Sequence, residues 1–125
     1  MSHSCKSPIV WHKAKALAVE TYRLTGKFPQ TERFGLTAQL RRTAVSVVSK
    51  VAEGQGRLTK GEFLQFLGHS RGSLLEVETQ LAIALDLNFI SNHEFEEMEK
   101  RTAEVLRLTK ALMDSMRPRL NTAGA

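Results

Sequence analysis

The chain has 125 residues, of which 42% are hydrophobic, 25% charged and 6% aromatic. This length suits one domain with its own core, so folding requires neither disulfides nor a structural metal. The one cysteine, Cys5, excludes an intrachain disulfide and favours a reducing, cytoplasmic location. No stretch approaches the roughly 18 apolar residues of a membrane span, and the first residues lack the apolar core of a signal peptide.

Charge is divided unevenly along the chain. Residues 1–73 hold 12 Lys and Arg against 4 Asp and Glu, whereas residues 74–125 hold 6 against 9. The formal net charge of +5 therefore combines a basic first part with an acidic second part. This asymmetry predicts an anionic partner or head-to-tail pairing within an assembly, and a solvated surface without a partner is the alternative.

The first predicted helix covers residues 8–25, where apolar positions recur at helical spacing and Pro8 suits the first turn. A second helix is predicted to begin at Thr31, with Glu32 favourably placed near its positive end. It ends at the glycine-containing segment 54–56.

Two capping boxes predict the starts of the next helices. Thr59 with Glu62 opens the third helix, for which Asn88 is the predicted C-cap, and Ser91 with Glu94 opens the fourth. Four helices with short connections predict an all-α, antiparallel up-down-up-down four-helix bundle. The expected core positions are Val10, Ala14, Leu17, Thr21 and Leu24; Leu36, Leu40, Ala44, Val47 and Val51; Phe63, Leu67, Leu74, Val77, Leu81 and Leu85; and Phe95, Met98, Val105, Leu106, Leu112 and Met113.

The domain limits follow from the ends of this pattern. Pro118 is expected to end the fourth helix, so the bundle domain is predicted to span residues 8–117. Residues 1–7 and 118–125 are predicted to be flexible tails.

The second predicted helix is apolar over an unusually wide arc. A second stripe of apolar and small residues on this helix widens its apolar arc to roughly 200°. A surface helix of a single domain needs an apolar arc of only about 100° or somewhat more. We therefore expect a homo-oligomer, and a generous internal core is the alternative. The predicted interface residues are Ala38, Val45, Val48 and Ala52.

Charged side chains also point into the apolar arcs of the second and third helices. An isolated buried charge is costly, so such residues must pair or reach an interface. Their positions predict an Arg41–Glu78 pair, with Arg71 satisfied by Glu53 or across a subunit boundary; a ligand site is the alternative. The predicted structural polar network comprises Arg41, Glu53, Arg71, Glu76 and Glu78.

The sequence offers no motif for catalysis or metal binding. Its histidines stand at no metal-ligand spacing, and neither a nucleophile elbow nor a phosphate-binding glycine loop is present. We therefore predict no catalytic residues, no metal, no cofactor and no enzyme activity.

Positive residues give a better indication of function. They follow the first helix, the polar face of the second helix and the loop after it, where they could contact phosphates in a salt-sensitive way. Trp11 and Tyr22 are the neighbouring aromatic residues that could stack on bases or pack in a core or interface. The predicted nucleic-acid-binding residues are Lys13, Lys15, Arg23, Arg42, Lys50, Arg57 and Lys60.

Several motifs between residues 9 and 116 resemble a known family. They are Phe28-Pro29, Glu32, Phe34-Gly35-Leu36, Gln39-Leu40-Arg41-Arg42, Ala44-Val45-Ser46, Val51-Ala52-Glu53-Gly54, Gly56-Arg57, Gly72-Ser73, Glu76, Glu78-Thr79 and Leu81. This pattern is similar to the four-helix-bundle proteins named for reading frames in intervening sequences of bacterial 23S ribosomal RNA genes. A relative is the accessory variability protein of diversity-generating retroelements.

The resemblance implies a left-handed bundle, a barrel-like homopentamer and a basic surface, and the retroelement relative works with a reverse transcriptase and binds nucleic acid. It also implies that Arg41, Arg42, Glu53, Glu76 and Glu78, at recurrent polar positions, determine fold and assembly. The chain departs from the family at Val48, where proline is common, and at Lys50, where asparagine is common.

These observations predict a non-enzymatic oligomer that binds nucleic acid, RNA or DNA, through its basic surface. Structured RNA or an RNA–protein complex is the expected ligand. The alternative is a scaffold that partners a reverse transcriptase or another nucleic-acid enzyme without touching nucleic acid itself.

Overall fold

The structure is a computed structural model that describes residues 7–117. Within this range it has no strand and four α-helices: α1 (Ser7–Thr25), α2 (Leu36–Gln55), α3 (Lys60–Asp86) and α4 (Asn92–Met116). A 3-10 helix, η1 (Gln30–Glu32), lies between α1 and α2. The all-α prediction is confirmed. Of the predicted tails only Ser7 is described, as the first residue of α1, and both Cys5 and the helix-ending Pro118 lie outside the described residues.

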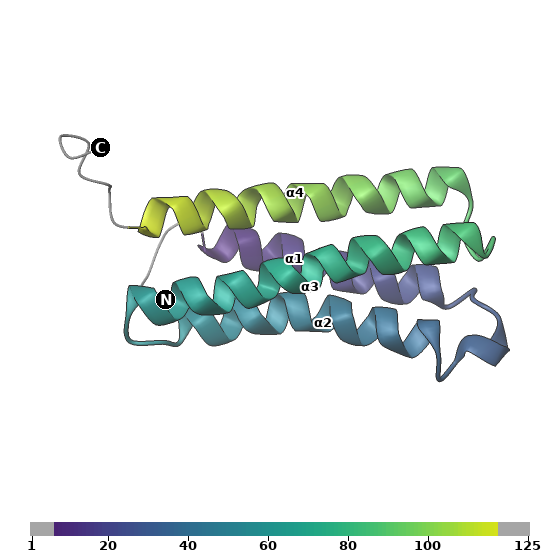
Figure 1. Cartoon of the computed structure of the whole chain (residues 1–125), viewed down its shortest axis with the longest axis horizontal. Helices are drawn as coiled ribbons and strands as arrows, with labels where there is room; N and C mark the ends of the chain where they lie inside the picture. Colours follow the sequence, from purple (N-terminus) through teal and green to yellow (C-terminus); the bar gives the residue numbers. More distant parts are fainter. Residues whose placement is uncertain (1–6, 118–125) are drawn as a thin grey trace.

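The four helices lie side by side along the long axis of the molecule (Figure 1). α2 packs against α1 and α3, and α4 packs against the same two helices. Each helix therefore has two neighbours, as in a four-helix bundle. The connection between α2 and α3 lies at one end of the bundle, and the other two connections lie at the opposite end (Figure 1). No described helix combines the length and the apolar character needed to cross a membrane.

The core lies between the four helices and uses the predicted stripes. Leu40, Ala44, Val47 and Val51 of α2 are fully buried, and the predicted positions of the other helices are buried or packed against the core. Thr21 is also buried, and its hydroxyl donates to the Leu17 carbonyl at 2.8 Å. This bond back along the helix satisfies a polar group that would otherwise be costly inside the bundle.

The capping box of α4 is confirmed. The Ser91 hydroxyl accepts a hydrogen bond from the Glu94 amide at 3.1 Å, and the Glu94 carboxylate accepts one from the Ser91 amide at 2.8 Å. In α3 the Thr59 hydroxyl accepts from the Glu62 amide at 3.1 Å, but it donates its own proton to the Glu62 carboxylate. Thr59 is thus the N-cap, as predicted, without the second backbone bond of a capping box.

The end of α3 explains the role of Asn88. Leu87 is the C-cap, and Asn88 follows it with a φ of 63°, in the left-handed region that asparagine tolerates. The Phe89 amide then donates to the Ala84 carbonyl at 2.9 Å, which closes a Schellman motif. The predicted boundary is therefore one residue late.

The predicted start of the second helix is wrong by five residues, because α2 begins at Leu36 and not at Thr31. Glu32 nevertheless acts on the helix end, since its Oε1 accepts a hydrogen bond from the Leu36 amide at 2.9 Å. Gly35 permits this approach, because a Cβ there would lie 2.7 Å from that oxygen. The acidic residue thus stabilises the N-terminus of α2 from the preceding 3-10 turn.

Candidate nucleic-acid interface

Two of the predicted phosphate-binding residues meet on one aromatic ring. The Lys50 Nζ lies 5.7 Å and the Arg57 Cζ 4.4 Å from the centroid of the Phe66 ring. Both distances suit cation–π attraction. We call Lys50, Arg57 and Phe66 the Phe66 cluster. Lys60, which is exposed, follows in the first turn of α3.

The close packing of α2 on α3 positions this cluster. A Cβ added at Gly54 would lie 2.6 Å from the Phe63 Cδ1 and 3.0 Å from the Phe66 Cβ. Any larger residue would force the Phe63 and Phe66 side chains to shift, so glycine allows the end of α2 to approach α3 and bring its basic side chains to the Phe66 ring. The first glycine of the segment Gly54-Gln55-Gly56, which ends α2, thus has a packing role.

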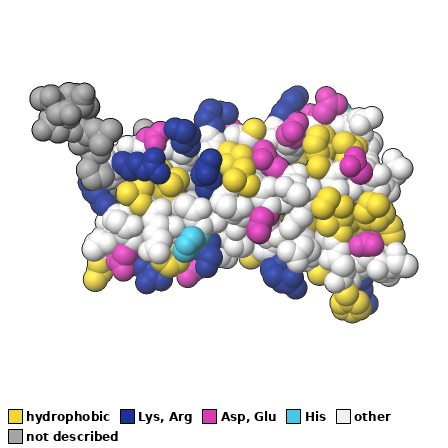
Figure 2. Space-filling model, in the orientation of Figure 1, with side chains coloured by type: hydrophobic (Ala, Val, Ile, Leu, Met, Phe, Trp, Pro, Cys, Tyr) yellow, Lys and Arg dark blue, Asp and Glu magenta, His cyan; other side chains and the backbone are white. Residues whose placement is uncertain are grey.

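The basic residues of α1 do not join the Phe66 cluster. Lys13 Nζ lies 3.5 Å from the Glu104 carboxylate, Arg23 pairs with Glu20, and Lys15 Nζ lies 4.7 Å from the Trp11 ring centroid. α1 packs beside α2 and α4 and is not a direct neighbour of α3, which carries Phe66, so these three cations have partners outside the Phe66 cluster. On the face seen in Figure 2, acidic and basic side chains are interspersed, with exposed apolar side chains between them.

A groove of about 530 Å³ carries the remaining predicted cation, Arg42. Phe34, at the approach to α2, is 87% exposed, and Val45 on α2 is 39% exposed. The Arg33 Cζ lies 5.2 Å from the Phe34 ring centroid. We call this surface the arginine–aromatic groove; it is lined by Tyr22, Arg33, Phe34, Thr37, Ala38, Arg41, Arg42 and Val45.

The predicted Arg41–Glu78 pair is wrong. Arg41 Nε instead donates to the Thr25 hydroxyl at 2.7 Å, and its Nη2 donates to the Tyr22 carbonyl at 3.3 Å. The guanidinium carbon also lies 4.6 Å from the Tyr22 ring centroid. Arg41 therefore faces the C-terminal turn of α1, where a cation is favourable, and not α3.

The other predicted polar positions are distributed over the surface. Glu53 Oε1 lies 3.4 Å from Lys50 Nζ, which leaves the predicted Glu53–Arg71 pair unformed. Arg71 is exposed and lines a hollow with Asp114, whose pKa is lowered by a hydrogen bond from the Lys110 ammonium group. Glu76 is exposed and Glu78 is half-buried on α3.

The predicted interface residues differ in their surroundings. Val45 and Ala52 are exposed on the outer side of α2, and Ala38 is half-buried beside the arginine–aromatic groove. Val48 is half-buried and packs against the core of its own bundle. The outer stripe available to a partner is therefore narrower than the sequence alone indicates.

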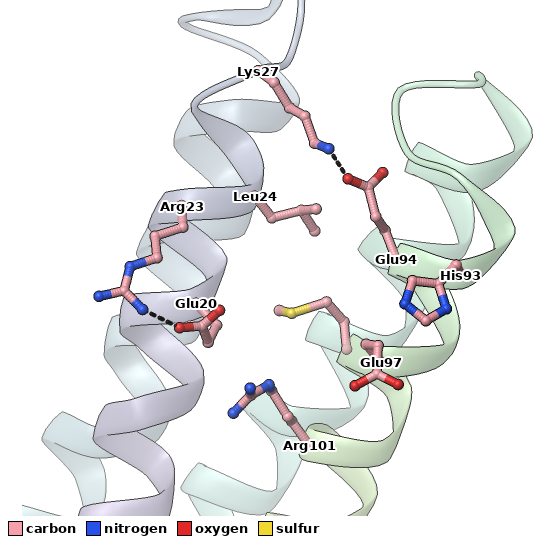
Figure 3. A pocket seen from close by; sticks show the side chains of 9 residues that line it. Glu20, Arg23, Leu24, Lys27, His93, Glu94, Glu97 and Arg101 are labelled. Atoms are coloured by element: carbon pink, nitrogen blue, oxygen red, sulfur yellow. Dashed lines mark hydrogen bonds and ion pairs between the residues drawn. The ribbon is translucent and has the colours of Figure 1, made fainter.

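A second hollow, of about 350 Å³, lies between α1 and α4 (Figure 3). Lys27, just after the end of α1, pairs with Glu94 of α4, and Arg23 pairs with Glu20 along α1. Arg101 and His93 also line the hollow. The pair between Lys27 and Glu94 links the end of α1 to the start of α4. Because acidic and basic side chains both line the hollow, neither positive nor negative charge dominates in it. Among residues 7–117, no group of three or more His, Cys, Asp or Glu side chains is arranged to hold a metal ion.

Comparison with known proteins places the chain in a family. The family model of the 23S rRNA-intervening sequence protein matches residues 6–111. The chain belongs to the 23S rRNA-intervening sequence protein family.

The fold of this family member is similar to a crystal structure of a protein of unknown function from the S23 ribosomal protein family of Bacteroides thetaiotaomicron. The TM-score is 0.82 at 18% sequence identity, over 87% of this chain and 98% of the other. At this identity the likeness concerns the fold alone. No curated protein matches the chain by sequence.

Sequence reasoning missed the most exposed part of this 23S rRNA-intervening sequence protein's groove. Arg33 and Phe34 were absent from the predicted site, because the helix was expected to begin at Thr31 and to include them. The sequence did contain an indication of this surface, because a basic and an aromatic residue stand next to each other directly before Gly35. They lie in the turn between η1 and α2, where both side chains are exposed.

Proposed function

We propose that this protein is a non-enzymatic, oligomeric four-helix bundle that binds structured RNA, alone or within an RNA–protein complex. The contact surface is the Phe66 cluster together with Lys60. Arg42, Lys13, Lys15 and Arg23 lie elsewhere on the bundle and add only long-range attraction.

The observation that carries the proposal is the placement of two cations on one aromatic ring. Cation–π contact holds the Lys50 and Arg57 side chains at the end of the bundle, so less side-chain entropy is lost when they meet phosphates. Phosphate contact by lysine and arginine releases counterions and does not depend on base sequence.

The test is fluorescence anisotropy of a labelled RNA hairpin titrated with the protein at several salt concentrations. Three phosphate contacts predict that log K falls with log salt with a slope of about −2 to −3. The double variant K50E/R57E should weaken binding at low salt by about tenfold or more and flatten the slope by about 1 to 2.

A matched control separates local contact from total charge. K100E/R107E reverses two exposed cations of α4, so it changes the net charge equally without touching the Phe66 cluster. We expect it to retain most of the binding. Equal losses in the two double variants, or binding that is insensitive to salt, would contradict the proposed surface.

The proposal also covers the arrangement of the molecule and of its assembly. Connections that alternate between the two ends of the bundle support an antiparallel, up-down-up-down order of the helices. We further propose that the bundle is left-handed, that the assembly has five subunits and that the protein is cytoplasmic. The assembly rests on the exposed apolar stripe of α2, and the number five and a kinship with the retroelement accessory protein rest on the sequence motifs.

A protein scaffold is the second candidate function. Leu58 lies between Arg57 and Lys60 in the chain and is 95% exposed, and such an apolar side chain suits a protein contact better than an RNA backbone. Capture of a purified reverse transcriptase after nuclease treatment, lost in the variant L58D, would favour this candidate over RNA binding.

A further inference from the structure

The arginine–aromatic groove has the composition of an incomplete interface. Three arginines line it, and no described ion pair provides any of them with a carboxylate. Arg41 is held by α1, which leaves Arg33 and Arg42 at the rim with only an aromatic ring and a glutamine beside them. The floor and rim expose Phe34 and Val45. A matching surface should therefore be acidic and apolar.

The outer face of α3 has these properties. Leu75 and Ile83 are 42% and 44% exposed, and Glu76 between them is exposed and forms no ion pair among the described residues. Glu76 also lines a hollow of about 230 Å³ with Gln80.

Gln80 gives an independent indication that a hydrogen-bond donor from another molecule approaches this face of α3. Its side chain is 9% exposed, and its Oε1 is buried without a hydrogen-bond partner among the described residues. A buried acceptor left unpaired costs free energy, which an arginine approaching the hollow would recover.

We propose that the arginine–aromatic groove of one copy packs onto the outer α3 face of a second copy. Arg42 then pairs with Glu76, and Phe34 and Val45 cover Leu75 and Ile83. The inference rests on the oligomer of the proposed function and names the two surfaces that form it.

A second copy fits better than nucleic acid as the occupant. The groove continues the exposed α2 stripe through Ala38 and Val45, and apolar side chains of this kind gain more from protein than from phosphate. The two surfaces lie on different helices, so each copy presents one groove and one α3 face. Such head-to-tail contact closes into a ring when the rotation between copies allows it.

The test is a charge-swap series measured by light scattering and sedimentation. R42E and E76R each reverse one side of the contact and should each lower the mass of the assembly, with a loss of affinity of about tenfold or more. The double variant R42E/E76R restores opposite charges across the contact and should regain the wild-type mass. R107E and E99R are the matched controls on α4, and both should leave the mass unchanged.

The outcomes separate this inference from the proposed function. Wild-type mass in either single variant, or failure of the double variant to reassemble while its helical circular dichroism is retained, overturns the docking of groove on α3. A monomeric wild-type protein overturns it as well. Lower RNA binding by R42E at unchanged mass would make the groove a nucleic-acid surface instead. RNA binding that depends on Lys50 and Arg57 is measured separately and survives any of these results.

Discussion

The two sides of α2 both carry apolar residues, yet only the inner side is fully buried by the chain itself. On the inner side, Leu40, Ala44 and Val47 are fully buried by the neighbouring helices of the same chain. On the outer side, Val45 remains exposed beside Phe34 and a set of arginines. Burial within one bundle therefore accounts for the inner stripe and leaves Val45 and Ala52 of the outer stripe exposed.

The largest expected difference is between one inner and one outer residue. L40A should lower the free energy of unfolding by about 3 kcal/mol, because the removed side chain leaves a cavity in a closely packed core. Urea denaturation followed by circular dichroism measures this loss.

V45D is the outer counterpart of that change. It should retain the helical spectrum while it lowers the mass of the assembly, since the Val45 side chain is exposed on the outer side of α2 and is not part of the buried core. An assembly of unchanged mass in V45D would remove the distinction between the two sides.

A pair of glycines compares close packing with open space. G54A should lower the free energy of unfolding by about 1 kcal/mol, because overpacking against Phe63 costs about 1–3 kcal/mol and the gain in helix propensity offsets about 1. G72A, in α3, meets nothing within 4 Å and should instead raise stability by about 0.5–1 kcal/mol. Chemical denaturation of both variants should give opposite signs, and a stabilising G54A would contradict the packing described at the end of α2.

The smallest effect concerns two adjacent arginines. R41A removes hydrogen bonds to Thr25 and to the Tyr22 carbonyl and should cost about 1 kcal/mol of stability. R42A should change the stability of the single bundle by less than about 0.5 kcal/mol, since it holds only a side-chain bond to Gln39. Thermal unfolding of dilute protein measures both, and equal losses would mean that the two residues share one role.

Local patterns in the sequence predicted most of the fold. The apolar stripes and the Ser91 cap depend on residues a few positions apart, which is the range over which helical periodicity and capping act. The start of α2 was misplaced because Glu32 stabilises the helix from outside it, and a charge near a helix end does not reveal which side it occupies.

The candidate site was harder to predict, because it depends on which helix faces which. Position on a helical wheel showed that Arg41 points away from the polar face, but it could not choose between α1 and α3 as its neighbour. In the same way, Lys13 and Lys50 are both basic, yet one pairs with Glu104 of α4 and the other lies over Phe66 of α3. The sequence shows that basic residues are present, but only the packing of the helices determines which of them lie close together on one surface.

The most direct test of the account is the mass of the wild-type protein in solution. If a second copy covers the outer side of α2, multi-angle light scattering over a series of dilutions should give a multiple of the 14.0 kDa chain, and five copies correspond to about 70 kDa. A stable monomer of 14.0 kDa at micromolar concentration would contradict the account.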